Sequence, residues 1–129
     1  DLRYGLRENV KGNKLAKTPE FTADASLVYE TDLASGNYMT AILQYVKRGK
    51  FEQRVSNNPA VDSIPGYDIV NLTIGVEFQN NMSIDFMLLN ATDEDGINSS
   101  MTDVFGVAAT GLELIPPRQI MTRISYDFW

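Results

Sequence analysis

The sequence contains no cysteine and no histidine among its 129 residues. These absences exclude disulfide frameworks, zinc sites built on thiolate or imidazole ligands, and catalytic triads that depend on a Ser–His or Cys–His pair. The carboxylates show no spacing that indicates an acid–base pair. We therefore expect no enzyme activity, no metal site and no cofactor.

Positive charge is scarce as well. The chain has 11 Lys and Arg residues against 17 Asp and Glu residues, which gives a formal net charge of -6. A nucleic-acid-binding surface needs enough basic side chains to neutralise phosphates. The charge balance therefore argues against a nucleic-acid partner.

Long hydrophobic runs are also missing, and hydrophobic residues make up only 43% of the chain. The longest weakly polar stretch, over residues 104–116, is interrupted by Gly106, Gly111 and Glu113. It is shorter than the roughly 20 residues that a membrane helix needs. A membrane β-strand turns only every second side chain to lipid, so it does not need such a run. Membrane helices are ruled out, whereas membrane strands are not.

What the sequence has instead is side-chain alternation with a period of two, which is typical of β-strands. It is clearest in the stretch over residues 116–129, where one side of an extended chain would carry Ile120, Thr122, Ile124, Tyr126 and Phe128, and the other Met121, Arg123, Ser125 and Asp127. The same alternation predicts strands over residues 21–30, 38–47, 70–78 and 83–88. Leu2, Tyr4 and Leu6 also alternate, which indicates part of a sixth strand and a chain that is a piece of a longer protein.

The predicted connections alternate between short and long. The turns at residues 32–37 and 79–81 are short, and the segments at 8–19, 48–66 and 91–117 are long. Aromatic residues gather at the short-turn end (Tyr29, Tyr38, Phe78, Tyr126, Phe128, Trp129) and at the long-loop end (Phe21, Tyr45, Tyr67). Outer-membrane barrels combine short turns, long loops and two aromatic belts in this way. The pattern favours an all-β, antiparallel up-and-down meander that forms the last five to six strands of a large transmembrane β-barrel.

Two alternatives remain open. A soluble β-sandwich that binds a ligand would show the same alternation, because period two serves both folds. A passive porin-type barrel would share both the alternation and the loop pattern.

Four motifs, in order, carry a resemblance to a known family. They are Gly12-Asn13-Lys14-Leu15-Ala16-Lys17-Thr18-Pro19, Ile64-Pro65-Gly66-Tyr67-Asp68-Ile69-Val70-Asn71-Leu72, Asn90-Ala91-Thr92-Asp93, and Pro116-Pro117-Arg118 followed by residues 120–128. In this order and spacing they resemble the C-terminal end of TonB-dependent outer-membrane receptors, so that residues 1–129 would be the C-terminal part of the β-barrel. The chain departs from the family in two places: Ala91 replaces the usual Leu of the third motif, and Trp129 follows Phe128 where the family commonly ends on Phe.

The resemblance implies a barrel of about 22 strands that is closed by an N-terminal plug domain absent from this sequence. It implies location in the bacterial outer membrane and energy-coupled uptake of a scarce nutrient, such as a siderophore, a vitamin or a glycan. The implied partners are the remaining barrel strands and the plug of the same receptor, TonB through the missing N-terminal region, outer-membrane lipids and lipopolysaccharide, and the barrel-assembly machinery. The resemblance also assigns an assembly signal to Tyr126, Phe128 and Trp129.

One basic and aromatic cluster stands out in the segment predicted as the first long loop between strands: Lys47, Arg48, Lys50, Phe51 and Arg54. It offers charge-assisted hydrogen bonds to an anionic ligand or to lipopolysaccharide phosphates. An ordinary solvated loop is the alternative, since loop charges often bind nothing specific.

Acidic residues carry two further expectations. Residues 93–98 place oxygen side chains around Gly96, but they lack the spacing of an EF-hand, so we expect a solvated corner rather than a calcium site. The acidic residues of the strands are expected to face a watery lumen: Asp24, Glu30, Glu77, Asp85 and Asp127.

Overall fold

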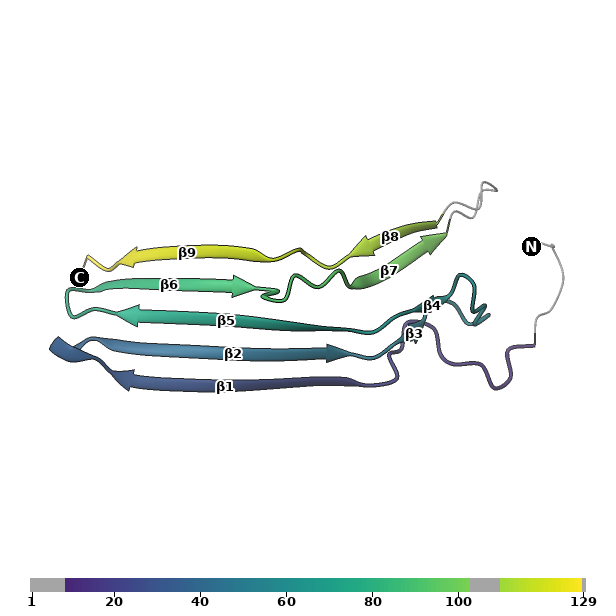
Figure 1. The fold of residues 1–129 in the computed structure, drawn as a ribbon, viewed down its shortest axis with the longest axis horizontal. Coiled ribbons are helices and arrows are strands. Elements are labelled where there is room, and N and C mark those ends of the chain that lie inside the picture. Colours follow the sequence, from purple (N-terminus) through teal and green to yellow (C-terminus); the bar gives the residue numbers. More distant parts are fainter. Residues whose placement is uncertain (1–8, 103–109, 129) are drawn as a thin grey trace.

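The computed structural model describes residues 9–102 and 110–128. Five strands form one antiparallel sheet in the order β1-β2-β5-β6-β9 (Figure 1). They are β1 (Thr22–Asp32), β2 (Tyr38–Arg48), β5 (Tyr67–Glu77), β6 (Met82–Leu89) and β9 (Gln119–Tyr126). This confirms the predicted all-β, up-and-down meander. The strand predicted around Leu2, Tyr4 and Leu6 lies outside the described residues.

The short and long connections lie at opposite ends of the sheet (Figure 1). At one end, β1 returns to β2 through a 3-10 turn, η1 (Ala34–Gly36), and β5 returns to β6 through residues 78–81. Both turns use residues that tolerate a positive φ, namely Ser35 (65°), Gly36 (74°) and Asn81 (62°). We call this the short-turn end, and the other the long-loop end.

The two long connections between strands of the main sheet each carry a hairpin that the alternation did not predict. In the first, β3 (Phe51–Glu52) pairs with β4 (Ser63–Ile64), and in the second, β7 (Ile97–Thr102) pairs with β8 (Thr110–Leu114). Strands of two residues are too short to show a period, and β7 reads INSSMT, which is mostly polar. The connections are therefore more ordered than their composition indicates.

The strand register places the apolar positions of neighbouring strands opposite one another. One row across the whole sheet consists of Leu27, Leu43, Leu72, Leu88 and Ile120. The apolar face thus holds every second residue over 23–31 in β1, 39–47 in β2, 68–76 in β5, 82–88 in β6 and 120–126 in β9. Lys47 and Asp68, paired at the long-loop end, are its only charged residues. The other residues of these strands, which alternate with those of the apolar face, form the polar face.

The apolar face is not covered by any described part of the chain. No residue of the five-stranded sheet is buried. Leu27 is 67% exposed, Ile124 is 68% exposed, and Phe86 is 37% exposed. Among the described residues, the buried hydrophobic side chains are Phe51 and Ile64, both in the β3–β4 hairpin. The dry core therefore lies at the long-loop end and not beneath the sheet.

The register corrects the predicted aromatic belts. Tyr29, Tyr45 and Tyr126 lie on the apolar face, as the belts require. Tyr38 lies on the polar face because it stands opposite Asp32 and Glu77. The belts on the apolar face are accordingly smaller than predicted.

Tyr67 is the second exception to those belts. It stands opposite Arg48, on the polar face.

In the described ranges, no helix is long and apolar enough to cross a membrane.

Candidate functional site

A chain of side-chain hydrogen bonds crosses the polar face near the long-loop end. The Gln44 amide donates to Asp24 Oδ2 at 3.0 Å, and the Asn71 amide donates to Gln44 Oε1 at 3.1 Å. Asn71 Oδ1 in turn accepts a hydrogen bond from the backbone N–H of Asn90 at 3.0 Å. The chain ties β1, β2 and β5 to the end of β6, so polar side chains fix this end of the sheet.

A second polar contact lies nearer the short-turn end. Arg123 donates to Asp85 Oδ2 from Nε at 2.9 Å, and its Nη2 lies 2.7 Å from the same oxygen. Gly75 stands opposite Asp85 in the register, and a Cβ at Gly75 would lie 2.8 Å from Asp85 Oδ1. The missing side chain leaves room for this ion pair. Asp24, Glu30, Glu77 and Asp85 all share the polar face, as predicted.

The predicted basic cluster is divided by the structure. Lys47 and Arg48 are the last residues of β2 and not loop residues, so their side chains point to opposite faces. Lys47 lies on the apolar face, opposite Asp68. Lys50 is exposed, and its Nζ lies 3.6 Å from Glu20 Oε1.

Arg48 is engaged inside the protein. Its guanidinium carbon lies 4.4 Å from the centre of the Phe51 ring and 5.9 Å from that of Tyr67. Its Nη1 donates to Asn98 Oδ1 at 2.9 Å. Phe51, predicted as a ligand contact, is only 2% exposed. These two residues join β2, the β3–β4 hairpin and β7, which gives them a structural role whether or not a ligand binds nearby.

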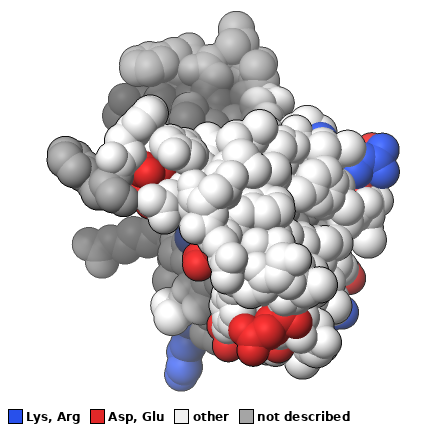
Figure 2. Space-filling model, turned by 90° about the vertical axis from the view of Figure 1, so that its left-hand side faces the viewer, with Lys and Arg blue, Asp and Glu red and all other residues white. Residues whose placement is uncertain are grey.

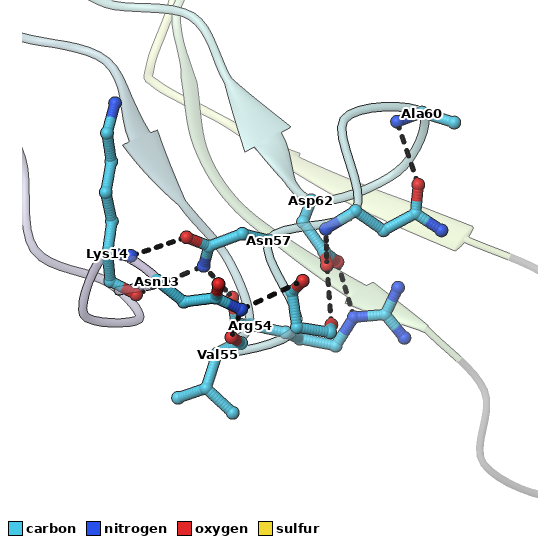
Figure 3. Close-up of polar contacts among 9 residues, drawn as sticks. Asn13, Lys14, Arg54, Val55, Asn57, Ala60 and Asp62 are labelled. Atoms are coloured by element: carbon cyan, nitrogen blue, oxygen red, sulfur yellow. Dashed lines mark hydrogen bonds and ion pairs between the residues drawn. The ribbon is translucent and has the colours of Figure 1, made fainter. Parts of the chain in front are cut away.

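Arg54 is also engaged, through a carboxylate that sequence reasoning missed. Asp62 is fully buried and accepts hydrogen bonds from Arg54 Nε at 2.5 Å, Ser56 Oγ at 2.7 Å and the Asn58 backbone N–H at 2.7 Å (Figure 3). Burial acts to raise the pKa of Asp62, but these hydrogen bonds and the Arg54 charge outweigh it and hold the pKa below its ordinary value. A charged Asp62 therefore organises residues 53–62.

The segment before β1 is fastened to the same loop. Asn57 accepts from the Lys14 backbone N–H at 2.5 Å and donates to the Lys14 carbonyl at 3.1 Å, much as a neighbouring strand would (Figure 3). The Asn13 amide donates to the Val55 carbonyl at 2.7 Å. Lys17 N–H donates to the Glu52 carbonyl at 2.7 Å. Hydrogen bonds thus hold residues 13–17, part of the first family motif, against residues 52–57.

The predicted corner after β6 is built around a buried asparagine. Asn90 is 4% exposed, and its side chain donates to the carbonyls of Glu94 and Pro116 and accepts from the Glu94 N–H. Asp93 accepts from the Arg118 backbone N–H at 2.9 Å. The polar residues of the corner hold backbone together, and the described ranges contain no group of three or more carboxylates that could hold a metal.

The β7–β8 hairpin bears a shallow hollow. Ser99, Met101, Gly111, Leu112 and Glu113 line it. Hydrogen bonds from Ser99 and Asn98 hold the pKa of Glu113 below its ordinary value. Met101 is 78% exposed. Of the weakly polar segment over residues 104–116, positions 104–109 lie outside the described residues.

Of the terminal aromatics predicted as an assembly signal, Tyr126 lies on the apolar face. The rings of Tyr126 and Phe128 meet edge to face, with centroids 4.9 Å apart. Both are exposed, Tyr126 by 52% and Phe128 by 86%. Trp129 lies outside the described residues.

Comparison with known proteins identifies no relative: no protein-family model, no curated protein and no solved structure matches the chain.

Proposed function

We propose that this chain is part of the wall of an outer-membrane transport barrel of the TonB-dependent receptor type, which takes up a scarce nutrient. The observation that carries the proposal is the uncovered apolar face of the five-stranded sheet. In water, exposed apolar patches of several hundred Å² are unusual and mark an interaction surface. Acyl chains would cover this face without any further protein layer.

The lengths of three of the five strands support this environment. Strands β1, β2 and β5 have 11 residues each, and β6 and β9 have eight. A tilted strand crosses a bilayer with about 9–11 residues. The two charged residues on the apolar face, Lys47 and Asp68, lie at the long-loop end, where side chains can reach lipid headgroups.

The edges of the sheet require further strands. In the described ranges, β1 pairs only with β2, and β9 only with β6. Unpaired backbone N–H and C=O groups cost several kcal/mol each in lipid, so a spanning sheet must close on itself. Other strands of the same receptor would complete the barrel, and the barrel-assembly machinery would act on the strand that carries Tyr126 and Phe128.

The long-loop end suits the capture of a ligand from outside. Its loops are tied down by the Asp62 and Asn90 hydrogen bonds, which reduces the entropy lost on binding. Lys47, Lys50 and Arg54 lie at this end and remain candidates for contact with an anionic ligand or with lipopolysaccharide phosphates. The chain supplies wall and capture surface, and no side-chain constellation described above suggests chemistry.

A soluble sandwich would need a second sheet over the apolar face. The described residues contain only two small hairpins besides the main sheet, and both lie at the long-loop end. A passive porin would have the same wall geometry, so a measurement of energy-coupled uptake has to distinguish a receptor from a porin.

The test combines fractionation and uptake in cells that produce the natural protein. We expect the protein in the outer-membrane fraction, and we expect gene deletion to abolish uptake of one member of a panel of metal chelates, vitamins and glycans. A protonophore should have the same effect. Uptake that survives the protonophore would indicate a porin, and recovery in the soluble fraction would contradict both barrels.

A further inference from the structure

The charges of the apolar face occupy a single row near the long loops. In this row, which we call the charged row, Ala23, Lys47 and Asp68 stand opposite one another on β1, β2 and β5. Within residues 9–102 and 110–128, the ion pairs include neither Lys47 nor Asp68, although the two are neighbours. A positive and a negative charge thus lie side by side on the apolar face, each without a partner in the described protein.

The other end of the apolar face carries no charge. Figure 2, which looks at the short-turn end, shows acidic side chains gathered along its lower border. The register places Glu30, Asp32 and Glu77, which lie in the strands at this end, on the polar face. The charged row is therefore the one place where a partner of the described apolar face would meet charge.

The row requires a partner that offers both signs of charge. A charge on the lipid side of a barrel is unfavourable unless it is compensated or reaches the headgroups. In an isologous contact, the same patch of two copies meets itself, so the patch has to be complementary to itself. A row that holds one lysine beside one aspartate meets this condition.

We propose that the charged row and the next row of the apolar face, Ala25, Tyr45 and Val70, form a contact between two copies of this chain in the membrane. The copies would be related by a two-fold axis along the membrane normal, with Lys47 of each copy opposite Asp68 of the partner subunit. The proposal rests on the proposed function, because it places the apolar face in a bilayer. It adds a second copy as partner, whereas the rows nearer the short turns remain in contact with acyl chains.

The register makes both ion pairs possible at once. A two-fold axis along the membrane normal keeps the height of every residue, so a side chain meets groups at its own level in the bilayer. Neighbouring strands lie only about 4.8 Å apart. Lys47 and Asp68 are register neighbours, so even in a tilted sheet they differ in height by no more than the flexible lysine side chain can span.

The neighbouring side chains suit close approach. Ala23 and Ala25 are exposed and carry only a methyl group beyond the backbone. Tyr45, between Ala25 and Val70 in the register, supplies an aromatic ring of the kind that is enriched in protein interfaces. Apolar contact would therefore accompany the two ion pairs.

Lipid alone fits the charged row less well. A phosphate of a lipid headgroup would compensate Lys47 but would be repelled by Asp68. Acyl chains would compensate neither residue. A second copy supplies one carboxylate and one ammonium group at the required height, because symmetry presents the same row in reverse order.

Charge exchange between co-produced copies tests the proposal in the natural outer membrane. All copies would carry p-benzoylphenylalanine at Val70, beside the proposed axis, and Ile124 on β9 is the control position on the same face. Lys47→Asp makes the row acidic, and Asp68→Lys makes it basic, so we expect either variant alone to lose crosslinked pairs several-fold through like-charge repulsion. When the two variants are co-produced with different affinity tags, we expect crosslinked pairs that carry both tags.

This rescue can arise only between copies. Repulsion within one copy is the same whether a variant is produced alone or with the other, so it cannot restore the yield. Crosslinking at Ile124 should give no pairs, because β9 lies outside the patch.

The outcomes separate the two proposals. In protein recovered from the outer membrane, the self-contact is overturned by a lack of pairs at Val70, by a product of Val70 with lipopolysaccharide or with a different protein, or by failure of co-production to restore pairs. None of these results touches the assignment to a membrane barrel. Recovery of the protein in the soluble fraction contradicts the proposed function, and the self-contact in a membrane with it.

Discussion

The side-chain amide of Asn90 donates a hydrogen bond of 3.1 Å to the carbonyl oxygen of Pro116, which lies 26 residues further along the chain. This contact closes the second long connection at its base, where the chain leaves β6 and enters β9. Asn90 also has a φ of 49°, a left-handed value that asparagine tolerates better than most residues. One side chain therefore sets both the backbone turn and the closure of the loop.

The first prediction concerns this closure. Asn90→Ala leaves the Glu94 and Pro116 carbonyls and the Glu94 N–H without their side-chain partner, and each buried unsatisfied group costs about 1–3 kcal/mol. We expect faster proteolysis within residues 91–117 and a lower melting temperature. Thr92→Ala, at an exposed position of the same connection, is the control and should change neither. Equal resistance of the two variants to proteolysis would contradict the role of Asn90.

The second prediction concerns the pH dependence of the Asp62 loop. Because the pKa of Asp62 lies below the ordinary value of 3.8, its carboxylate contributes stability above that pH, and this contribution is lost as the pH falls through the folded pKa. Hydrogen exchange in residues 53–62, corrected for intrinsic rates, should stay slow from neutral pH down to about 4 and rise only below it.

Substitution separates Asp62 from other acid effects. Asp62→Asn should speed exchange in this loop already at neutral pH and remove most of the acid-induced change, because the buried charge is gone. Asp68→Asn, at an exposed position, is the control and should behave like the unmodified protein. An Asp62→Asn loop that remains as protected as the original would show that the carboxylate does not organise it.

The third prediction contrasts two neighbours at the end of β2. Arg48→Ala removes the contact with the Phe51 ring and the hydrogen bond to Asn98, and we expect a loss of about 1–3 kcal/mol. Lys47→Ala, on the opposite face and with no side-chain partner in the described ranges, should cost much less. Amide exchange in β7 should increase only in the Arg48 variant. A similar response to both substitutions would indicate that β2 is held by its backbone alone.

The fourth prediction concerns close backbone packing at Gly66, within the second family motif. A Cβ there would lie 2.5 Å from the Arg48 carbonyl oxygen and 3.0 Å from two further backbone atoms, which cannot move aside cheaply. Gly66→Ala should therefore destabilise the fold by about 1–3 kcal/mol. Gly111→Ala is the matched control, because its nearest neighbour would be 3.9 Å away. Thermal melts that do not distinguish the two variants would contradict the packing at Gly66.

The main sheet could be predicted from sequence because the signals that define it lie close together along the chain. Alternation with a period of two gives the strand positions, and short turns give the antiparallel order. Leu43 and Leu72 stand opposite each other, as both alternation patterns require. Val28 and Ile42 interrupt the pattern in sequence, and in the structure they stand opposite each other on the polar face. The two exceptions to the alternation therefore meet as one apolar contact between neighbouring strands.

The long-loop end could not be predicted in the same way, because its contacts join segments far apart in sequence. Nothing local to Asp62 marks it as buried, and Asn57 acquires its role only when Lys14, 43 residues away, lies beside it. The residues of the basic cluster do not share one surface, because Lys47 and Arg48 belong to a strand and neighbouring residues of a strand point to opposite faces. A charge count along the chain ignores that separation.

The central claim is that the apolar face meets lipid while the polar face meets water, and spin-label accessibility tests it most directly. The chain contains no cysteine, so single cysteines can be introduced and labelled with a nitroxide at Leu27, Ala41 and Ile124 and at their neighbours Ser26, Thr40 and Ser125. In the natural protein in bilayers, we expect the first three to be relaxed by oxygen and the second three by a water-soluble nickel chelate. Labels at Leu27, Ala41 and Ile124 that are shielded from both reagents would place the apolar face in a dry protein interior and would contradict the account.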